Sequence, residues 1–309
     1  MLVLVAGATG NIGQKLIGSL IRRGHQVRAL GRNRDKLPSH LRDQLESFVT
    51  ISAYWDVPAL DAACAGSVGA VVNAYNGTPE LQLEGQLLLL HAAERAGIRT
   101  FVTATWNYDW RKLQLGDHES YDPYICFKRQ VELTSTIKPV YILSGVLGEV
   151  LFAAPGHEYY TTASHGVWDP NPGARAVEVW GDPALKFHWT SEEDAAEFAA
   201  AIAERPDAAD GGFWTVASGT HSLPEIAETY GRVRGVDVAV RLKGSVEELR
   251  KLAHEARGRG DPSRFWDYIG YFYTLHTVDG TWALGELENE KLGVKGTSLE
   301  DFIRAHPEI

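Results

Sequence analysis

Cysteine and long apolar runs are both scarce in this 309-residue chain. Cys64 and Cys126 are its only cysteines. Both lie in apolar sequence, so we expect reduced thiols and neither a disulfide framework nor a cysteine zinc site. The N-terminal MLVLVAGATGNIG has no basic start or cleavage site of a signal peptide, and its apolar part is far too short to cross a bilayer. We therefore expect a cytoplasmic protein without a membrane span.

Positive charge is also in short supply. Lysine and arginine number 30 against 40 acidic residues, which gives a net charge of -10. Nucleic acids and anionic membranes bind basic surfaces, so we expect neither as a partner. The 11 histidines include no i, i+4 pair flanked by a carboxylate, as a zinc-binding helix has, and we expect no metal.

Up to about residue 152, short apolar runs alternate with amphipathic stretches of helical period. Six runs have the composition of strands, namely LVLVA, QVRAL, FVTISA, GAVVNAY, TFVTATW and VYILSG. The helical stretches include NIGQKLIGSLIRR and ELQLEGQLLLLHAAERAG. This alternation predicts an α/β fold with a doubly wound parallel sheet, a Rossmann domain over residues 1–152.

The sequence changes in character after residue 153, where AAPGHEYYTTASHGVWDPNPG is rich in aromatic, His, Gly and Pro residues and has no clear period. Helical patterns return in SEEDAAEFAAAIAE, SLPEIAETYGRVRG, SVEELRKLAHEARGRG and TSLEDFIRAH, with strand-like FWTVAS and DVAVRL between them. We expect residues 153–309 to form a smaller, discontinuous C-terminal substrate lobe, from which 186–204 returns to the Rossmann core.

The turn GATGNIG lies between the first predicted strand and the first predicted helix. Its glycines, Gly7, Gly10 and Gly13, let a backbone approach a pyrophosphate, and a helix N-terminus directs N–H groups at the anion. We expect this turn to hold a dinucleotide, with contacts from Thr9, Asn11 and Ile12 as well. The alternative is that the glycines only make a tight turn.

A basic cluster follows the second predicted strand, where an acidic residue would hold the ribose of NAD. Arg32 stands there instead, with Arg34 and Lys36 nearby, and these cations can face a 2′-phosphate. We therefore expect NADP(H), although a solvated basic loop has the same composition. Further contacts to the cofactor are expected from residues at later strand ends, namely Asp56, Asn73 and Ala74.

The segment DPYICFKR, residues 122–129, places Tyr124 four residues before Lys128. Asp122 is a suitable N-cap and Pro123 suits the first helical position, so we expect a helix with both side chains on one face. A tyrosine pKa near ~10 is too high for a base at neutral pH, and an adjacent ammonium lowers it. The pattern alone also fits two helix residues that merely share a face.

Four of these features together resemble the atypical short-chain dehydrogenase/reductases, in particular their NmrA-like and isoflavone-reductase-like branch. They are GATGNIG, Arg32 after the second strand, VNAYNG at the fourth and YICFK beyond the fifth. DVPALDAACAGSVGAVVNA, TSEEDAAEFAAAI and TSLEDFIRAH extend the resemblance over most of the chain.

The resemblance implies roles for individual side chains. Tyr124 would exchange a proton with a substrate oxygen, while Lys128 would hold the nicotinamide ribose and lower the Tyr124 pKa. Isoflavone-reductase-like enzymes keep the lysine and usually replace the tyrosine by an apolar residue, so Lys128 alone is an alternative proton carrier. Tyr121 is a rival for the hydroxyl role. A Ser or Thr at the end of the fifth strand would polarise the substrate oxygen, and of the candidates Thr103 and Thr105, Thr105 lies nearer the carboxyl end.

Aromatic and polar residues crowd two segments that follow predicted strands. Flat aromatic walls with a few polar groups suit a small aromatic or polyketide-like molecule, although such residues also pack a lobe. The candidates are Trp106, Asn107, Tyr108, His157, Tyr159, Tyr160, His165 and Trp168.

Two classes of function remain. The first is an NADPH-dependent reductase of a carbonyl, C=C or quinone, or a redox-neutral isomerase or ring-opening enzyme of the same fold. The second is an NADP-binding regulator without turnover. The presence of both Tyr124 and Lys128 favours the enzyme, while the sequence leaves monomer and homodimer both open.

Overall fold

The computed structural model describes all residues, 1–309, and its core is a sheet of seven parallel strands. The strand order is β11-β6-β5-β4-β1-β2-β3, so the chain winds outward in both directions from β1, as a doubly wound fold requires. All six predicted strands are present in this sheet. The strands are β1 (Leu2–Ala6), β2 (Gln26–Gly31), β3 (Ser47–Thr50), β4 (Val68–Asn73), β5 (Thr100–Val102), β6 (Val140–Leu143) and β11 (Gly212–Thr215).

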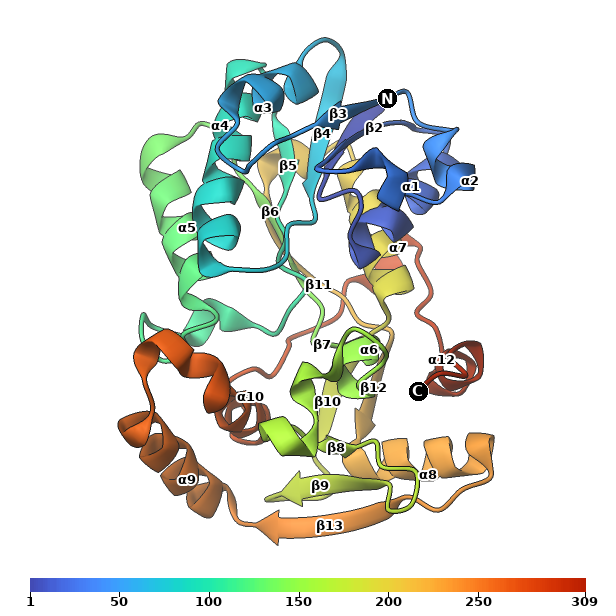
Figure 1. The fold of residues 1–309 in the computed structure, drawn as a ribbon, viewed down its shortest axis with the longest axis vertical. Helices are drawn as coiled ribbons and strands as arrows, with labels where there is room; N and C mark the ends of the chain where they lie inside the picture. The colour runs from blue at the N-terminus through green and yellow to red at the C-terminus, as the bar shows by residue number, and fades with distance from the viewer.

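Helices cover both faces of this sheet, because its central strands are apolar on both sides. Along β1, Leu2 and Leu4 belong to one buried cluster, and Val3 and Val5 to the other. On one face α1 packs against α7, and on the other α4 lies between α3 and α5 (Figure 1). Their bounds are α1 (Asn11–Arg22), α3 (Val57–Cys64), α4 (Gln86–Arg95), α5 (Asp122–Thr134) and α7 (Glu192–Ala203).

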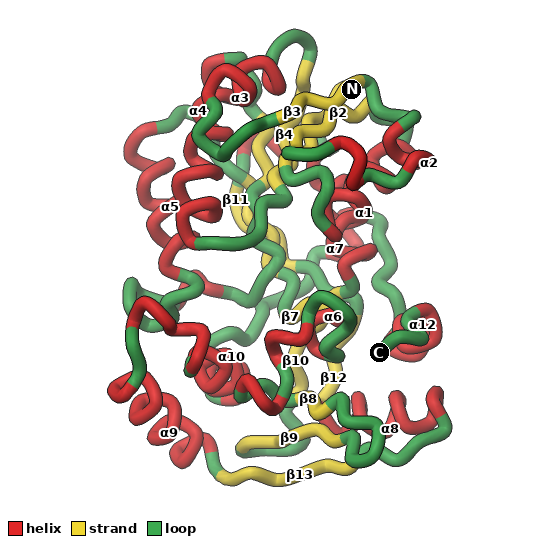
Figure 2. The backbone as a smooth tube through the Cα atoms, viewed as in Figure 1, coloured by secondary structure: helices red, strands yellow, loops and turns green.

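The lower part of the molecule in Figures 1 and 2 is a smaller lobe with two three-stranded sheets. In one sheet β10 lies between β12 and β7, and in the other β9 lies between β13 and β8. The strands are β7 (Val146–Leu147), β8 (Trp168–Asp169), β9 (Ala176–Trp180), β10 (Lys186–Thr190), β12 (Gly219–Ser222) and β13 (Ala239–Gly244).

Helices complete the lobe, and one of them, α10, does not follow from the sequence patterns above. Its sequence, IGYFYTLHTV, has no polar face, because it packs between α9 and the rest of the lobe. The main helices here are α8 (Leu223–Arg234), α9 (Val246–Arg259), α10 (Ile269–Val278) and α12 (Leu299–Ala305), with the short α6 (Gly148–Leu151). Two other short helices contact the core, α2 (Ser39–Arg42) beside α1 and α11 (Asn289–Leu292) beside α7.

The segment expected to return to the core, 186–204, divides at its middle. Strand β10 pairs with β12 and β7 and so belongs to the lobe, while α7 returns and packs on α1. A second return was not predicted, since β11 pairs in parallel with β6 at the edge of the main sheet. The strand-like FWTVAS therefore serves the core and not the lobe.

No helix combines the length and apolar character needed to span a bilayer. Likewise, no group of three or more His, Cys, Asp or Glu side chains is placed to hold a metal ion.

Candidate functional site

The glycine turn joins β1 to α1 at the carboxyl edge of the sheet. Backbone N–H groups of Gly7 and Ala8 donate to the Leu30 carbonyl, at 3.1 and 3.2 Å, and fix the turn to the end of β2. Gly7 has a φ of +75°, and a Cβ there would lie 2.5 Å from the Ala74 oxygen. A Cβ at Gly13 would lie 2.2 Å from the Gly7 oxygen. Both positions thus require glycine for the backbone to pack.

Gly10 differs, because packing alone does not require it. Its φ is -80°, and an added Cβ would meet only the Gly7 oxygen, at 3.3 Å. Gly10 is also the N-cap of α1, and no side chain caps this helix. The N–H groups of the first turn therefore remain free for an anion, and a side chain at Gly10 would enter that space.

The basic residues after β2 are unengaged. Arg32, Arg34 and Lys36 are exposed, and none of them forms an ion pair or side-chain hydrogen bond. The acidic residue among them, Asp35, pairs instead with Arg42. The end of β2 lies beside the turn, since a Cβ at Gly31 would contact the Thr9 methyl at 3.4 Å. Three free cations thus follow the strand that borders the glycine turn.

The other residues expected to contact the cofactor interact with neighbouring residues of the protein. Asp56 caps α3 by accepting from Ala59 N, and hydrogen bonds from Ser52 and this cap lower the Asp56 pKa. Asn73 is fully buried and donates to Gln86 Oε1 at 2.7 Å, an oxygen that also accepts from Ala104 N. Gln86 therefore ties the chain after β4 to the chain after β5. Ala74 faces the turn through its backbone oxygen, next to Gly7.

Asn107 gathers two tyrosine hydroxyls just beyond β5. The Tyr121 hydroxyl donates to Asn107 Oδ1 at 2.6 Å, and Asn107 Nδ2 donates to the Tyr124 hydroxyl at 3.4 Å. The sequence predicted Asp122 as the N-cap of α5, but the N-cap is Tyr121. The Asp122 carboxylate instead accepts a hydrogen bond from Gly116 N. The chain around the start of α5 thus presents two hydroxyls to one amide.

Lys128 does not contact Tyr124 in this structure. Its ammonium pairs with Glu132, one turn further along α5, and the side chain is 34% exposed. Burial, with a smaller contribution from Tyr273, raises the Tyr124 pKa above its ordinary value. The expected lowering of that pKa by Lys128 is therefore not present here.

Thr105 is engaged by the sheet. Its hydroxyl oxygen accepts from Ile142 N at 3.0 Å and lies 2.8 Å from the Thr103 hydroxyl, which donates to the Val140 carbonyl. Both threonines are buried. Their hydroxyls maintain the contact with β6 between the backbone pairing of Val102 with Val140 and the isolated bridge of Asn107 with Leu143.

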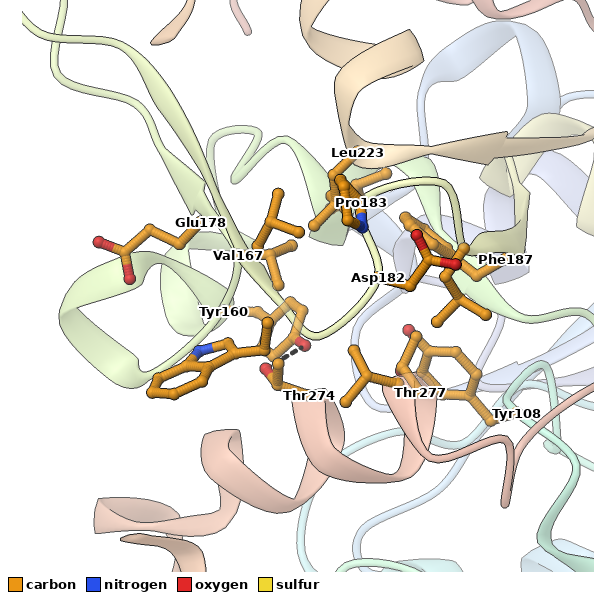
Figure 3. A pocket seen from close by; sticks show the side chains of 15 residues that line it. Tyr108, Tyr160, Val167, Glu178, Asp182, Pro183, Phe187, Leu223, Thr274 and Thr277 are labelled. Atoms are coloured by element: carbon orange, nitrogen blue, oxygen red, sulfur yellow. Dashed lines mark hydrogen bonds between the residues drawn. The ribbon is translucent and has the colours of Figure 1, made fainter. Parts of the chain in front are cut away.

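A narrow, largely apolar pocket lies inside the lobe, and its accessible volume is only about 30 Å³. Tyr108 and Tyr160 are the only expected substrate residues in its wall (Figure 3). Tyr160 hydrogen-bonds Thr274 of α10 at 3.2 Å, and Tyr108 stacks on Trp282 with ring centroids 4.4 Å apart. The wall includes neither the glycine turn nor Tyr124, so Tyr108 and the adjacent Asn107 form the link between the pocket and the hydroxyl pair.

The other expected substrate residues are dispersed. Trp168 is 1% exposed and packs on Phe152 and Tyr230, so it supports the core of the lobe. Trp106 is buried in the cluster that includes the alanines of α7. His165 stacks on Tyr271, and Tyr159 is 60% exposed. These four residues do not converge on one cavity.

His157 lies at the junction of lobe and core. Its Nε2 is 3.0 Å from Asn11 Nδ2 and 3.3 Å from Glu192 Oε1. The second Glu192 oxygen pairs with Lys15 of α1 at 2.9 Å. A hydrogen bond to the Glu192 carboxylate raises the His157 pKa. Burial alone would raise the Glu192 pKa, but its hydrogen bond with His157 and the Lys15 ammonium outweigh burial, and the Glu192 pKa lies below its ordinary value.

Several residues that shape this region were not found from the sequence. Gln86 and Glu192 lie on helices recognised only by their apolar periodicity, and Tyr273, Thr274 and Trp282 belong to an aromatic segment without a period. The density of aromatic residues between 265 and 282 is a signal that could have indicated Tyr273, Thr274 and Trp282.

Comparison with known proteins identifies the family of this chain. Residues 1–257 match the NmrA-like family. A 3-diazoavenalumate denitrifying reductase of a Streptomyces species is 35% identical over 116 residues, covering 33% of this chain and 36% of that protein. Pinoresinol reductase 2 of Arabidopsis thaliana is 24% identical over 213 residues, covering 66% of this chain and 65% of that one. The chain thus matches roughly a third to two thirds of these relatives' lengths, and both are reductases.

Solved structures extend the similarity in fold to the lobe. The binary complex of leucoanthocyanidin reductase with NADPH from Vitis vinifera superposes with a TM-score of 0.75 at 16% identity, covering 99% of both chains. At this identity the likeness concerns the fold, and it includes the lobe as well as the Rossmann core.

Proposed function

Because this chain belongs to the NmrA-like family, we propose that it is an NADPH-dependent oxidoreductase acting on a small aromatic or polyketide-like metabolite. The observation that carries the proposal is the pair of tyrosine hydroxyls held by Asn107 at the carboxyl edge of the sheet, the edge that also bears the glycine turn. Ligands of doubly wound folds bind at this edge.

The residues of the turn fit a dinucleotide. Gly10 and the first turn of α1 would receive the pyrophosphate, and Arg32, with Arg34 or Lys36, would receive the 2′-phosphate. When bound, NADPH would supply the hydride. The remaining cofactor candidates, Asp56 and Asn73, would act by holding the strand ends in place, since their side chains are engaged locally.

Proton transfer is assigned to the start of α5. Tyr124 would donate a proton to a substrate oxygen, with Asn107 orienting its hydroxyl. Lys128 would turn from Glu132 to the cofactor ribose, which costs little because a partly exposed ion pair is worth about 0–1 kcal/mol. Thr105 would hold the edge between β5 and β6 rather than touch substrate, given its backbone partner.

The class of substrate is inferred from the residues that line the pocket of the lobe. Tyr108 and Tyr160 line the apolar pocket with aromatic faces, and Thr274 satisfies the Tyr160 hydroxyl, which would suit a flat, weakly polar molecule once the narrow pocket widens to admit it. Tyr159 and His157 do not line this pocket, so neither is assigned a contact with the substrate. The similarity to reductases of 3-diazoavenalumate and of pinoresinol supports the same class.

The proposal is tested by mixing purified protein with NADPH and a panel of aromatic ketones, enones and quinones, and following absorbance at the NADPH band. Turnover of at least one class above the rate without protein is expected. Tight binding of NADPH with no turnover across the panel would contradict the proposal that the protein is an enzyme.

That second outcome describes the alternative function, an NADP-binding regulator without turnover. Two observations favour it: Lys128 is paired with Glu132, and burial raises the Tyr124 pKa. The regulator predicts that cofactor binding changes association with a partner while NADPH remains unconsumed.

A further inference from the structure

His157 joins the substrate lobe to the glycine turn through a single ring nitrogen. The side chain is 11% exposed, so water does not readily replace its partners. Nε2 faces the amide nitrogen of Asn11, the first residue of α1, and a carboxylate oxygen of Glu192, the first residue of α7. One neighbour is a hydrogen-bond donor and the other an acceptor, so the nitrogen cannot satisfy both in one protonation state.

The two protonation states therefore select different partners. A neutral ring with its proton on Nδ1 accepts from the Asn11 amide at Nε2. A protonated ring donates from Nε2 to Glu192, and the Asn11 amide then loses its acceptor. Nδ1 lies 3.5 Å from the Tyr159 hydroxyl, which can accept in either state.

The charges around the ring come from three helices and its own loop. Glu192 of α7 favours the protonated ring most, Glu149 of α6 adds to it, and Lys15 of α1 opposes it. Glu158 precedes Tyr159 in the same loop and is exposed. The hydrogen bond with Glu192 leaves the His157 pKa above its ordinary value despite burial.

We infer that His157 is a positioning residue of the dinucleotide site, which releases the Asn11 amide to the cofactor when its ring takes up a proton. The inference rests on the proposed function, because it takes the cofactor pyrophosphate to lie at the start of α1. A released amide adds a donor there, and an imidazolium adds positive charge beside the turn. Protonation and dinucleotide binding must then strengthen each other by the same factor.

The lobe gains a role from this arrangement. His157 belongs to the lobe and Asn11 to the core, so the cofactor affinity of the core depends on a lobe side chain being in place. Substrate that displaces the loop around His157 would change cofactor affinity without touching the cofactor.

The test measures binding of NADP+ and of NAD+ by titration calorimetry between pH 5.5 and 8.5, in buffers of different ionisation enthalpy. NAD+ is included because the 2′-phosphate of NADP+ itself ionises near about pH 6. For the unaltered protein we expect proton uptake on binding and a Kd that rises at least about fivefold from pH 6 to 8.5, the lower end of ordinary coupling. With NAD+, which lacks this phosphate, His157→Gln should show neither effect, while His40→Gln, a change at an exposed histidine on α2, should show both.

Asn11→Ala supplies a second variant, since it removes the amide and leaves the ring charged. It should weaken binding at low pH and keep part of the pH dependence, and thermal unfolding of each apo variant checks that the fold is intact. An unchanged pH profile in His157→Gln would overturn the inference. If the unaltered protein binds neither dinucleotide at any pH, the proposed function fails first, and the inference with it.

Discussion

The hydroxyl pair at Asn107 shows how a side chain beyond a strand end can organise a site. The side-chain amide of Asn107 accepts from the Tyr121 hydroxyl and donates to the Tyr124 hydroxyl. The backbone carbonyl of Asn107 accepts from Ser144 N and Gly145 N. The amide is therefore fixed at both ends, and the two hydroxyls are held in different states. Tyr121 uses its proton on Asn107, whereas the Tyr124 hydroxyl accepts from Asn107 and keeps its proton for another acceptor. This asymmetry is why Tyr124 is the proposed donor.

Tyr124→Phe should lower kcat by on the order of a hundredfold with the Kd for NADPH unchanged, because it removes only the acid–base group. Tyr121→Phe, its matched control, should cost about 1 kcal/mol of unfolding free energy and leave most of the rate. Lys128→Met should impair both kcat and NADPH binding. Steady-state kinetics and fluorescence titration measure these quantities. Near-normal rates in the Lys128 variant would show that Tyr124 and Lys128 are only neighbours on a helix and not a catalytic pair.

The glycines of the turn should separate binding from folding. Gly10→Val should abolish dinucleotide binding and leave the melting temperature close to that of the unaltered protein, since only the Gly7 oxygen lies near the new Cβ. Gly7→Ala should lower the melting temperature, because its φ is +75° and the Cβ would lie 2.5 Å from the Ala74 oxygen. Calorimetric titration and thermal unfolding distinguish the two. Normal binding by Gly10→Val would place the phosphates elsewhere.

At the scale of elements, the start of α7 is stabilised by a carboxylate from another helix. Ser191 caps the helix by accepting from Asp194 N at 3.0 Å. Both oxygens of Glu149, in α6, accept from Glu192 N, at 3.1 and 3.0 Å. Glu149 is 4% exposed, and burial followed by the nearby Glu192 raises its pKa to about 7. A helix of the core thus depends on a group of the lobe that titrates near neutral pH.

Stability should fall as pH rises through the Glu149 pKa. The folded protein holds this proton more tightly than the unfolded chain, whose carboxyl has its ordinary pKa of 4.5. The stabilising effect is thus complete below about pH 4.5 and is lost towards pH 7, by up to about 3 kcal/mol. Urea unfolding from pH 4.5 to 8 should show a flatter profile for Glu149→Gln than for Glu286→Gln, an exposed control. Parallel profiles would contradict this account.

The loop after β2 should determine the choice of cofactor. Arg32→Ala should erase most of a preference for NADPH over NADH that we expect to be about tenfold or more, since one phosphate contact is worth about 1.4 kcal/mol. Arg129→Ala, an exposed change on α5, is the control. Equal affinity for the two cofactors in the unaltered protein would be evidence against the assignment.

The sequence predicted the elements whose signals are local and missed those whose signals depend on distant partners. Alternation and helical period were enough for the six strands and for α1, α4, α7, α8, α9 and α12. The start signals of Asp122 and Pro123 were enough for α5, and glycine spacing was enough for the turn. The position of β11 depends on its pairing with β6. Thr105 is typical of an active site by position alone, yet its hydroxyl is engaged by Ile142, which no local pattern indicates. Helix α10 lacks a polar face, so periodicity could not reveal it.

At the scale of the whole molecule, core and lobe exchange segments repeatedly. The chain leaves the core after β6 for β7, returns from β10 to α7, and passes from β11 directly into β12 of the lobe. Asn289, far along the chain, donates to the Ala217 carbonyl and accepts from Ala217 N. The core and the lobe are therefore connected by several chain crossings and not by one hinge.

A fragment ending at residue 152 should not fold. It lacks α7, which covers one face of the sheet, and β11, which completes one edge. The buried face formed by Val3, Val5 and their neighbours would be left partly open to water. Far-UV circular dichroism and amide proton dispersion of the fragment, compared with the full chain, measure this. A well-dispersed, cooperatively melting fragment would show that the core is independent.

The late arrival of β11 and α7 also matters during synthesis. When β6 emerges from the ribosome, its partner β11 still lies about 70 residues away, which takes roughly 4–14 s at about 5–20 residues per second. Throughout that interval the nascent sheet presents an unpaired edge at β6 and an uncovered apolar face. We expect the growing chain to be a client of chaperones that bind such surfaces, until the alanine-rich α7 docks on α1.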